Sequence, residues 1–210
     1  MKAIVLIADI VSSRNIKDRN TVQKKLRDIL MKINRESHSI LSPMTITLGD
    51  EFQCVYSKAD DIFRHIWEII NACYPEKIRF SFGIGEITTD INEKRAIGMD
   101  GPAFYAAREG LTALKKTDYF FNLDSNDKNS ESLDFVRNIL YLISYNVAPW
   151  RKNRIEIMNL MTKKIAVKII AERMKISEQA VYKNINSGGL QPILDITKNI
   201  TGMINKIVES

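Results

Sequence analysis

The chain has 210 residues, of which 45% are hydrophobic and 27% are charged, and its formal net charge is +6. This composition is typical of a globular protein and excludes a disordered or fibrous chain. No apolar run approaches the roughly 18 residues that a membrane-spanning helix needs, so we expect no membrane partner. Two cysteines and two histidines are too few for a disulfide framework, a zinc site or an iron–sulfur cluster. We therefore expect a reduced, cytoplasmic protein.

Positive charge is concentrated in the second part of the sequence. Residues 1–125 contain 18 Lys and Arg against 17 Asp and Glu, whereas residues 126–210 contain 13 against 8. A nearly neutral first part and a basic second part indicate two roles, and a basic surface suits nucleic acid. A short helical domain that merely carries some extra lysines would show the same charge, so charge alone leaves both interpretations open.

Strand and helix patterns alternate along the first 125 residues. The resulting order, β-α-β-β-α-β-α-β, predicts an α+β fold with a ferredoxin-like sheet that carries helices on one face. Apolar runs or apolar alternation predict strands over 2–9, 44–48, 52–56, 78–87 and 119–123. Apolar residues at helical spacing predict helices over 21–39, 60–73 and 103–115.

Only helical patterns follow. The polar stretch LDSNDKNSES, residues 123–132, is the predicted domain boundary. We therefore expect a sheet domain over residues 1–125 and an all-helical domain over residues 133–210. The predicted helices of the second domain cover 133–147, 151–162, 164–174, 178–186 and 190–208.

The segment IAERMKISEQAVYKNI, residues 170–185, resembles the bacterial helix-turn-helix pattern. Ala171 is the small residue where the two helices would touch, Val181 and Ile185 share one face of the second helix, and Ser177 is suited to cap its start. Lys175 takes the turn position at which such proteins usually have glycine. The alternative is an ordinary helical hairpin used for dimerisation or docking.

The outward side of the second helix is the predicted DNA contact. Gln and Asn can read an adenine edge, and Lys can contact a phosphate. Basic residues from Arg151 to Lys183 favour DNA through the attraction of phosphate charge. The predicted DNA-binding residues are Ser177, Gln179, Ala180, Lys183 and Asn184.

Two aspartates are placed to share a site at one edge of the predicted sheet. Asp9 ends the first strand and Asp50 lies in the hairpin turn. Converging carboxylates repel each other unless a divalent cation lies between them, and oxygen ligands suit Mg²⁺ or Mn²⁺. The loop after Asp9 offers Ser12, Ser13 and Arg14 to a phosphate. Taken singly, these residues also fit a loop cap, a turn and a solvated loop.

Four sequence blocks together resemble the SatD family of bacterial proteins. They are ADIVSSR (8–14), LGDEFQ (48–53), FGIGEITT (82–89) and MDGPAFYAAR (99–108). The same blocks are similar to a diverged catalytic domain of class III nucleotidyl cyclases, and LGDEF is similar to the GGDEF signature of diguanylate cyclases, which share a palm-like sheet. The family resemblance also implies a helical, helix-turn-helix-like tail.

The cyclase resemblance implies roles for individual residues. It makes Asp9 and Asp50 the metal ligands, with the carbonyl of Ile10 as a third. It makes Arg108 the residue that stabilises charge on a phosphate, and it places Asp100 near the position that selects the purine. Since class III cyclases form their sites at a dimer interface, it also implies a homodimer.

The base- and ribose-reading half of the cyclase site is missing. Phe104 stands where the family has the asparagine that orients the ribose, and Ile46 stands where it has the lysine that reads the base. Either loss removes groups that position the reacting hydroxyl. We therefore expect the metal and phosphate half of the site to persist without cyclase activity.

The leading hypothesis is a cytoplasmic regulator with two domains. Its sheet domain binds a nucleotide or another phosphorylated small molecule with Mg²⁺, and its helix-turn-helix domain binds DNA. One alternative is a metal-dependent enzyme acting on nucleotide phosphates, such as a nucleotidyl transferase or phosphohydrolase. Another is a non-catalytic module for dimerisation or protein interaction.

Overall fold

The computed structural model of the chain describes residues 1–125 and 131–209, except for the side chains of Arg14 and Glu131. Part of the predicted domain boundary, residues 126–130, lies outside the described residues.

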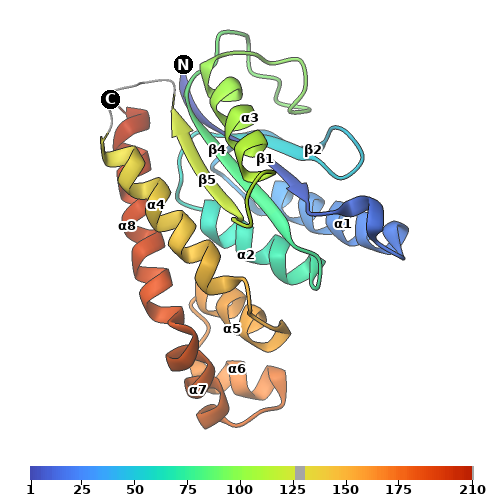
Figure 1. Cartoon of the computed structure of the whole chain (residues 1–210), viewed down its shortest axis with the longest axis vertical. Coiled ribbons are helices and arrows are strands. Elements are labelled where there is room, and N and C mark those ends of the chain that lie inside the picture. Colours follow the sequence, from blue (N-terminus) through green and yellow to red (C-terminus); the bar gives the residue numbers. More distant parts are fainter. Residues whose placement is uncertain (126–130, 210) are drawn as a thin grey trace.

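Five strands form one sheet (Figure 1). Their order in space is β2-β3-β1-β4-β5; the first four are antiparallel neighbours, and β5 is parallel to β4. The order β2-β3-β1-β4 is ferredoxin-like, and β5 extends it. The predicted α+β class is confirmed. The strands are β1 Lys2–Ile10, β2 Ile40–Ile46, β3 Phe52–Tyr56, β4 Ile78–Glu86 and β5 Phe121–Ser125.

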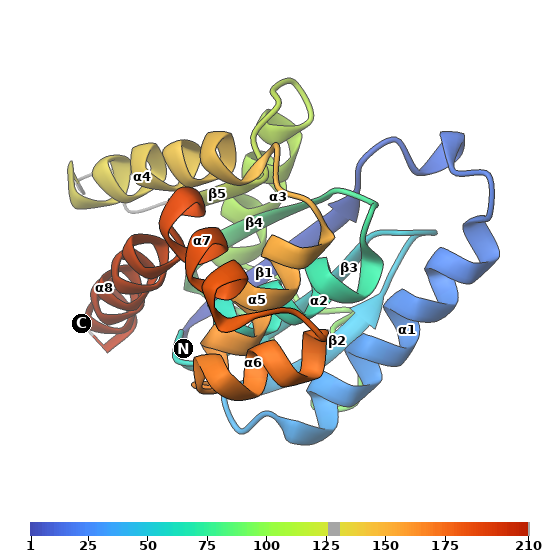
Figure 2. The same ribbon diagram turned by 90° about the horizontal axis from the view of Figure 1, so that it is seen from below.

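The helices divide into those that connect strands and those that follow the sheet. Figures 1 and 2 show the later helices gathered at one side of the sheet, with α6 and α7 farthest from the strands. No helix among the described residues is long and apolar enough to cross a membrane. The helices are α1 Arg19–Glu36, α2 Ile62–Cys73, α3 Pro102–Leu114, α4 Glu131–Val147, α5 Lys152–Thr162, α6 Val167–Met174, α7 Glu178–Gly188 and α8 Leu190–Glu209, with a short 3₁₀ helix at Ser13–Asn15.

Both faces of the sheet are covered, so the expectation of helices on one face is wrong. Ile4 and Leu6 of β1 belong to the larger core, together with residues of α1, α2 and the later helices. Val5 and Ile7 point the other way, into a second core with α3. The reason is that β1 is apolar on both faces, and a strand without polar alternation must be buried on both sides.

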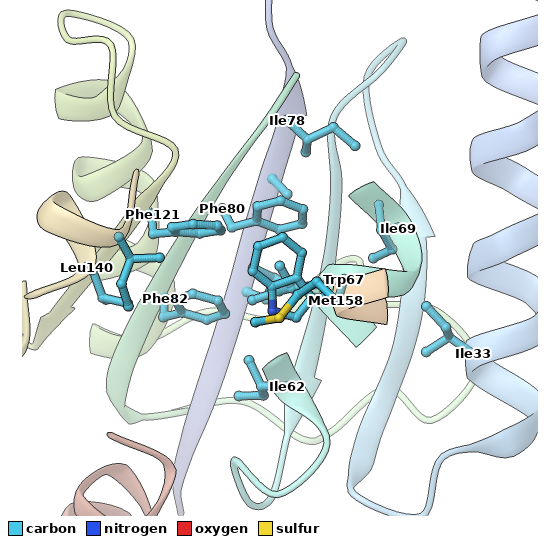
Figure 3. Close-up of a cluster of buried hydrophobic side chains, with 14 of the residues drawn as sticks. Ile33, Ile62, Trp67, Ile69, Ile78, Phe80, Phe82, Phe121, Leu140 and Met158 are labelled. Atoms are coloured by element: carbon cyan, nitrogen blue, oxygen red, sulfur yellow. The ribbon is translucent and has the colours of Figure 1, made fainter. Parts of the chain in front are cut away.

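The later helices share the larger core with the sheet. Figure 3 shows Phe80 and Phe121 from the sheet beside Trp67 of α2, Leu140 of α4 and Met158 of α5. Trp67 also stacks on Trp150, which precedes α5, with ring centroids 5.6 Å apart. The helical half is therefore joined to the sheet by a continuous apolar core.

A buried carboxylate reinforces this joint. Glu68 of α2 is 3% exposed, and its oxygens lie 2.6 Å from Lys32 Nζ, 3.2 Å from Arg64 Nη1 and 3.3 Å from Lys163 Nζ. Burial alone would raise the pKa of Glu68, but the hydrogen bond from Lys32 and the charges of Lys163 and Lys32 hold it below its ordinary value. Glu68 is thus ionised and links α1, α2 and the end of α5.

Glycine allows β4 and α3 to approach closely. A Cβ atom at Gly83 would clash with the carbonyl oxygen of Ala103 and would lie 2.5 Å from the backbone nitrogen of Ala107. Both obstacles are backbone atoms of α3, which a side-chain rotation does not remove. The position of α3, and of the charged residues on it, therefore depends on this glycine.

We expect Gly83→Ala to lower the free energy of unfolding by more than about 2 kcal/mol, because α3 must move away from β4. Gly202→Ala is the matched control, since an added methyl there meets nothing within 4 Å. In that helical position, alanine should raise stability by about 0.5–1 kcal/mol. Urea unfolding measures both changes. Similar small effects for the two variants would contradict the close packing of α3 on β4.

Candidate functional site

Charged side chains meet at one end of the sheet. The β1–β3 pairing places Ala8 opposite Phe52, so that Asp9 follows beside the hairpin turn that contains Asp50. The β1–β4 pairing places Arg79 opposite Asp9. We call this group the rim cluster: Asp9, Arg19, Asp50, Glu51, Arg79, Arg108 and Lys115.

Asp9 is the most enclosed carboxylate of the rim cluster. It is 8% exposed, and its Oδ2 lies 3.1 Å from Lys115 Nζ at the end of α3. Its Oδ1 lies 3.9 Å from Arg79 Nη1, too far for a hydrogen bond. Asp9 Oδ1 and Arg79 Nε are both buried without a hydrogen-bond partner. The facing side chains of Asp9 and Arg79 thus each keep one unsatisfied polar atom, which a water molecule or another small polar group would satisfy.

The pKa of Asp9 reflects this enclosure. Burial raises the pKa of Asp9, the hydrogen bond and charge of Lys115 and the charge of Arg79 oppose the rise, and the charge of Asp50 adds to it. The net direction is upward. The smallest of these effects is the charge of Asp50, so the two carboxylates influence each other only weakly.

The hairpin turn holds the other two carboxylates. Gly49 has a φ of 65°, a left-handed conformation that suits glycine in this turn, and its carbonyl accepts a hydrogen bond from Gln23 of α1. Asp50 Oδ1 lies 3.7 Å from Arg19 Nη2. Glu51 Oε2 accepts a hydrogen bond of 2.7 Å from Arg108 Nη1. Arg108 therefore reaches the predicted site, where it contacts a carboxylate.

The predicted phosphate loop begins at the same end of the sheet. Ser12 has a φ of 52°, and its carbonyl accepts a hydrogen bond from Asn15 N that closes the short 3₁₀ helix. Ser12 is exposed and Ser13 half-buried. The side chain of Arg14 lies outside the described residues.

Asp100 lies at the other end of the sheet. It precedes Gly101, which contacts the backbone of Glu86, and Glu86 is paired with Lys2 at the start of β1. Asp9 is seven residues farther along β1, or roughly 24 Å in an extended strand. Asp100 instead accepts hydrogen bonds from Gly101 N and the Tyr105 hydroxyl. Within one chain, the structure does not bring Asp100 to the rim cluster.

The two residues that depart from the cyclase pattern lie in apolar surroundings. Phe104 is 8% exposed and belongs to the core between α3 and the sheet. Ile46 is half-buried at the end of β2, opposite Phe52, and packs against the larger core. Both side chains thus have a packing role in this fold.

The segment predicted as a helix-turn-helix forms α6 and α7. Lys175 has a φ of 55° and a ψ of 44°, so the turn position does take the left-handed conformation that glycine would adopt most easily. Ser177 Oγ accepts a hydrogen bond of 3.1 Å from Ala180 N at the start of α7. Ala171 and Val181 are buried between the helices of this half.

The five predicted DNA-binding residues differ in availability. Gln179 and Lys183 are exposed on α7. Ser177 is exposed but caps the helix through its hydroxyl, and Ala180 is half-buried. Asn184 is half-buried, and its amide donates a hydrogen bond of 2.9 Å to the carbonyl of Ala180.

Two open hollows lie next to each other beside α7 and share Pro149 and Arg154; we call them together the basic groove. Its walls are the start of α5, the connection from α4, Tyr74 and the second half of α7. Arg154 Nη2 donates a hydrogen bond of 2.8 Å to Ser187 Oγ of α7. No acidic residue appears among the described residues that line it, and α5 has no acidic residue in its first turn. The groove residues are Tyr74, Tyr145, Asn146, Ala148, Pro149, Trp150, Arg151, Lys152, Asn153, Arg154, Asn184 and Ser187.

The sequence interpretation missed three rim residues: Arg19, Arg79 and Lys115. The sequence could have identified Arg79 as a site residue, since it is the single charged residue between residues 78 and 84 of an otherwise apolar strand. Arg19 and Lys115 lie at helix ends whose placement depends on tertiary packing, and no local pattern marks them.

We expect Lys115→Met to raise the pKa of Asp9 further, because it removes the hydrogen bond and charge that oppose the effect of burial. Lys116→Met is the matched control, since this neighbouring lysine is exposed and does not contact Asp9. Carboxyl-carbon NMR titration of the wild type and both variants measures the change. An unchanged Asp9 titration in Lys115→Met would contradict the observed ion pair.

Comparison with known proteins gives one family and several distant folds. No curated protein matches the chain. A bacterial light-regulated adenylyl cyclase is similar in structure, with 13% identity and a TM-score of 0.44 over 58% of this chain and 74% of the other. The dimeric guanylyl cyclase domain of the RhoGC fusion protein from the aquatic fungus Blastocladiella emersonii is similar, with 14% identity and a TM-score of 0.40 over 53% and 73%. The SatD family matches residues 3–204, nearly the whole described chain, and the protein therefore belongs to the SatD family.

Proposed function

We propose that this protein is a DNA-binding regulator in which α6 and α7 form a helix-turn-helix. The observation that carries the proposal is the basic groove beside α7, whose described lining contains Arg151, Lys152 and Arg154 and no carboxylate. A groove lined by positive charges and no negative ones attracts the phosphate backbone of a duplex before any base is read.

The geometry divides the contacts into two kinds. Arg151 and Lys152 lie at the start of α5, where the helix dipole adds positive potential, and they would contact phosphates on one side of α7. Gln179 and Lys183 are exposed on α7 itself, where Gln179 would read a base edge and Lys183 a phosphate. Phosphate contacts would fix the position of α7, and α7 would supply the sequence preference.

The combined variant Arg151→Ala, Lys152→Ala should weaken binding to a labelled DNA duplex. Each lost phosphate contact lowers the steepness of log affinity against log salt by about 0.9, so the double variant should lose nearly 2. Fluorescence anisotropy at several salt concentrations measures both affinity and slope.

The control removes two lysines elsewhere. Lys24 and Lys25 are exposed on α1, which Figures 1 and 2 show well apart from α7. Lys24→Ala, Lys25→Ala makes the same change in net charge and should leave the salt slope unchanged. Equal losses for the two double variants would mean that net charge, and not the groove, attracts DNA.

A second function is favoured by the rim cluster, which we propose as the binding site of a nucleotide or another phosphorylated molecule. Four cationic side chains surround three carboxylates there, and Asp9 Oδ1 and Arg79 Nε have no hydrogen-bond partner. Arg108 and Lys115 are about half exposed and lie on α3 above the end of β1, within reach of a ligand that enters from solvent.

Mg²⁺ would have to be held here by two carboxylates together with such a ligand, because the described residues contain no group of three or more His, Cys, Asp or Glu side chains that could hold a metal ion. Asp9 and Asp50 repel each other weakly, Asp9 Oδ1 is an unsatisfied buried acceptor, and Mg²⁺ is commonly held by two carboxylates together with phosphate oxygens. Asp9 and Asp50 would hold Mg²⁺, which would supply positive charge beside a phosphate. Lys115 and Arg108, which now contact Asp9 and Glu51, are the side chains that would contact the phosphate.

One short connection links the segment that follows β1 to the basic groove. Val11, just after β1, donates a hydrogen bond of 2.8 Å to the carbonyl of Lys77, which lies between α2 and β4. Tyr74 of the same connection lines the basic groove. A ligand that favours one position of this connection would therefore change the groove, as a regulator requires.

A thermal-shift screen of nucleotides with and without Mg²⁺ tests the rim cluster. We expect a Mg²⁺-dependent rise in the unfolding temperature, since ligand in hundredfold excess over its dissociation constant adds about 2.7 kcal/mol of stability. The rise should be lost in Asp50→Ala. It should persist in Asp100→Ala, because Asp100 lies at the opposite end of the sheet. The absence of any shift, or a shift that survives Asp50→Ala, would contradict the proposal.

A further inference from the structure

Helix α4 carries an apolar stripe on its solvent side. Phe135, Leu142 and Tyr145 are 62%, 66% and 77% exposed. The opposite side of α4 is already used, since Leu133, Val136, Leu140 and Ile143 are buried in the larger core. The exposed stripe is therefore not needed to attach α4 to the sheet, and isolated apolar side chains do not usually align in this way.

The stripe has the spacing of a coiled-coil contact. Residues 135, 138, 142 and 145 are separated by three, four and three positions, the a–d repeat of a heptad. Phe135, Leu142 and Tyr145 occupy three of these positions, and Asn138 occupies the fourth. No charged residue occurs from 138 to 150, so charge repulsion does not oppose a partner along this side.

We propose that the stripe pairs with the same stripe of a second copy of this chain, with the two α4 helices antiparallel. The four positions are symmetric about residue 140, and an antiparallel pair therefore places Phe135 against the partner's Tyr145. The same symmetry places Asn138 against the partner's Leu142. Each contact occurs twice, as a two-fold interface requires.

Charge favours the antiparallel arrangement. Asp134, whose side chain is 70% exposed and paired with Arg137 of the same helix, lies near the start of α4, whereas Arg151 and Lys152 follow its end. Antiparallel pairing brings the acidic end of one helix toward the basic end of the other and opposes the two helix dipoles. Parallel pairing would place the two Asp134 side chains together.

The area of the stripe indicates a weak dimer. Three large side chains exposed to this degree offer roughly 400 Å² per copy, against about 800 Å² per partner in a standard interface. The dimer should therefore dissociate on dilution. Tyr145, Arg151 and Lys152 also belong to the basic groove, so the pairing and the proposed DNA contact meet at this end of α4. The exposure and spacing of the stripe, which carry the pairing, do not depend on DNA binding.

Sedimentation equilibrium over a wide range of protein concentration tests the pairing. We expect the wild type to be dimeric at high concentration and Leu142→Glu to be monomeric throughout. Leu48→Glu, at the 80% exposed tip of the hairpin turn, is the matched control and should dimerise as the wild type does. Circular dichroism checks that both variants are folded. A monomeric wild type, or a dimer that persists in folded Leu142→Glu, would overturn the proposal.

Cysteine crosslinking tests the direction of the pair. The native Cys54 and Cys73 are buried and do not interfere. Phe135→Cys and Tyr145→Cys should form a disulfide-linked dimer when the two variants are mixed under mild oxidation. Neither should crosslink alone, because the two copies of either position lie about 15 Å apart in an antiparallel pair. Crosslinking of each variant alone would show a parallel pair and overturn the proposed arrangement.

Discussion

The buried carboxylate of Glu68 is the charge on which the arrangement of the two halves depends. It receives Lys32 from α1, Arg64 from its own helix and Lys163 from the end of α5. An ionised group that is 3% exposed is tolerated only when cations compensate its lost hydration. Those cations come from both halves of the chain, and Trp67 beside it stacks on Trp150. The helical half is thereby fixed in position on the sheet, and with it the basic groove.

The rim cluster likewise places partly buried carboxylates beside cations. Asp9 is partly compensated by Lys115 and Arg79, while Asp50 and Glu51 hold Arg19 and Arg108. Every carboxylate there contacts a cation, yet Asp9 Oδ1 and Arg79 Nε remain unsatisfied. A phosphorylated ligand with Mg²⁺ would exchange these internal ion pairs for contacts with phosphate. Under this proposal, the ion pair with Glu51 holds Arg108 at the rim cluster until an anion binds.

Much of the fold could be predicted from the sequence because its signals are local. Apolar alternation identified the strands, helical spacing identified the helices, and Gly49 with Asp50 marked the hairpin turn. The placement of α3 opposite α1 and α2 was missed, although the apolar run of β1 and Gly83 were both visible. The strand order of the predicted sheet also placed Asp9 and Asp50 at the same end of the sheet. Arg79, Lys115 and Lys163 could not be assigned to partners, because strand register and helix docking set those contacts over long sequence distances.

The later helices and the sheet share one hydrophobic core. Ile170, Val181, Leu190 and Ile204 belong to the same core cluster as Phe80 and Phe82 of the sheet. The connection that contains Tyr74 and Lys77 is hydrogen-bonded to Val11 after β1 and lines the basic groove, so the proposed coupling would pass through it. Ligand-controlled DNA binding would also require two arrangements of this connection that the ligand and the DNA distinguish.

Hydrogen–deuterium exchange of the full chain, with and without a DNA duplex, would locate the surface that binds DNA. We expect added protection in residues 151–154, which line the basic groove, and in residues 177–187 of α7 and its cap, with little change in α1. Protection confined to α1 or to the rim cluster, or no protection anywhere at saturating DNA, would contradict a DNA-binding role for α7.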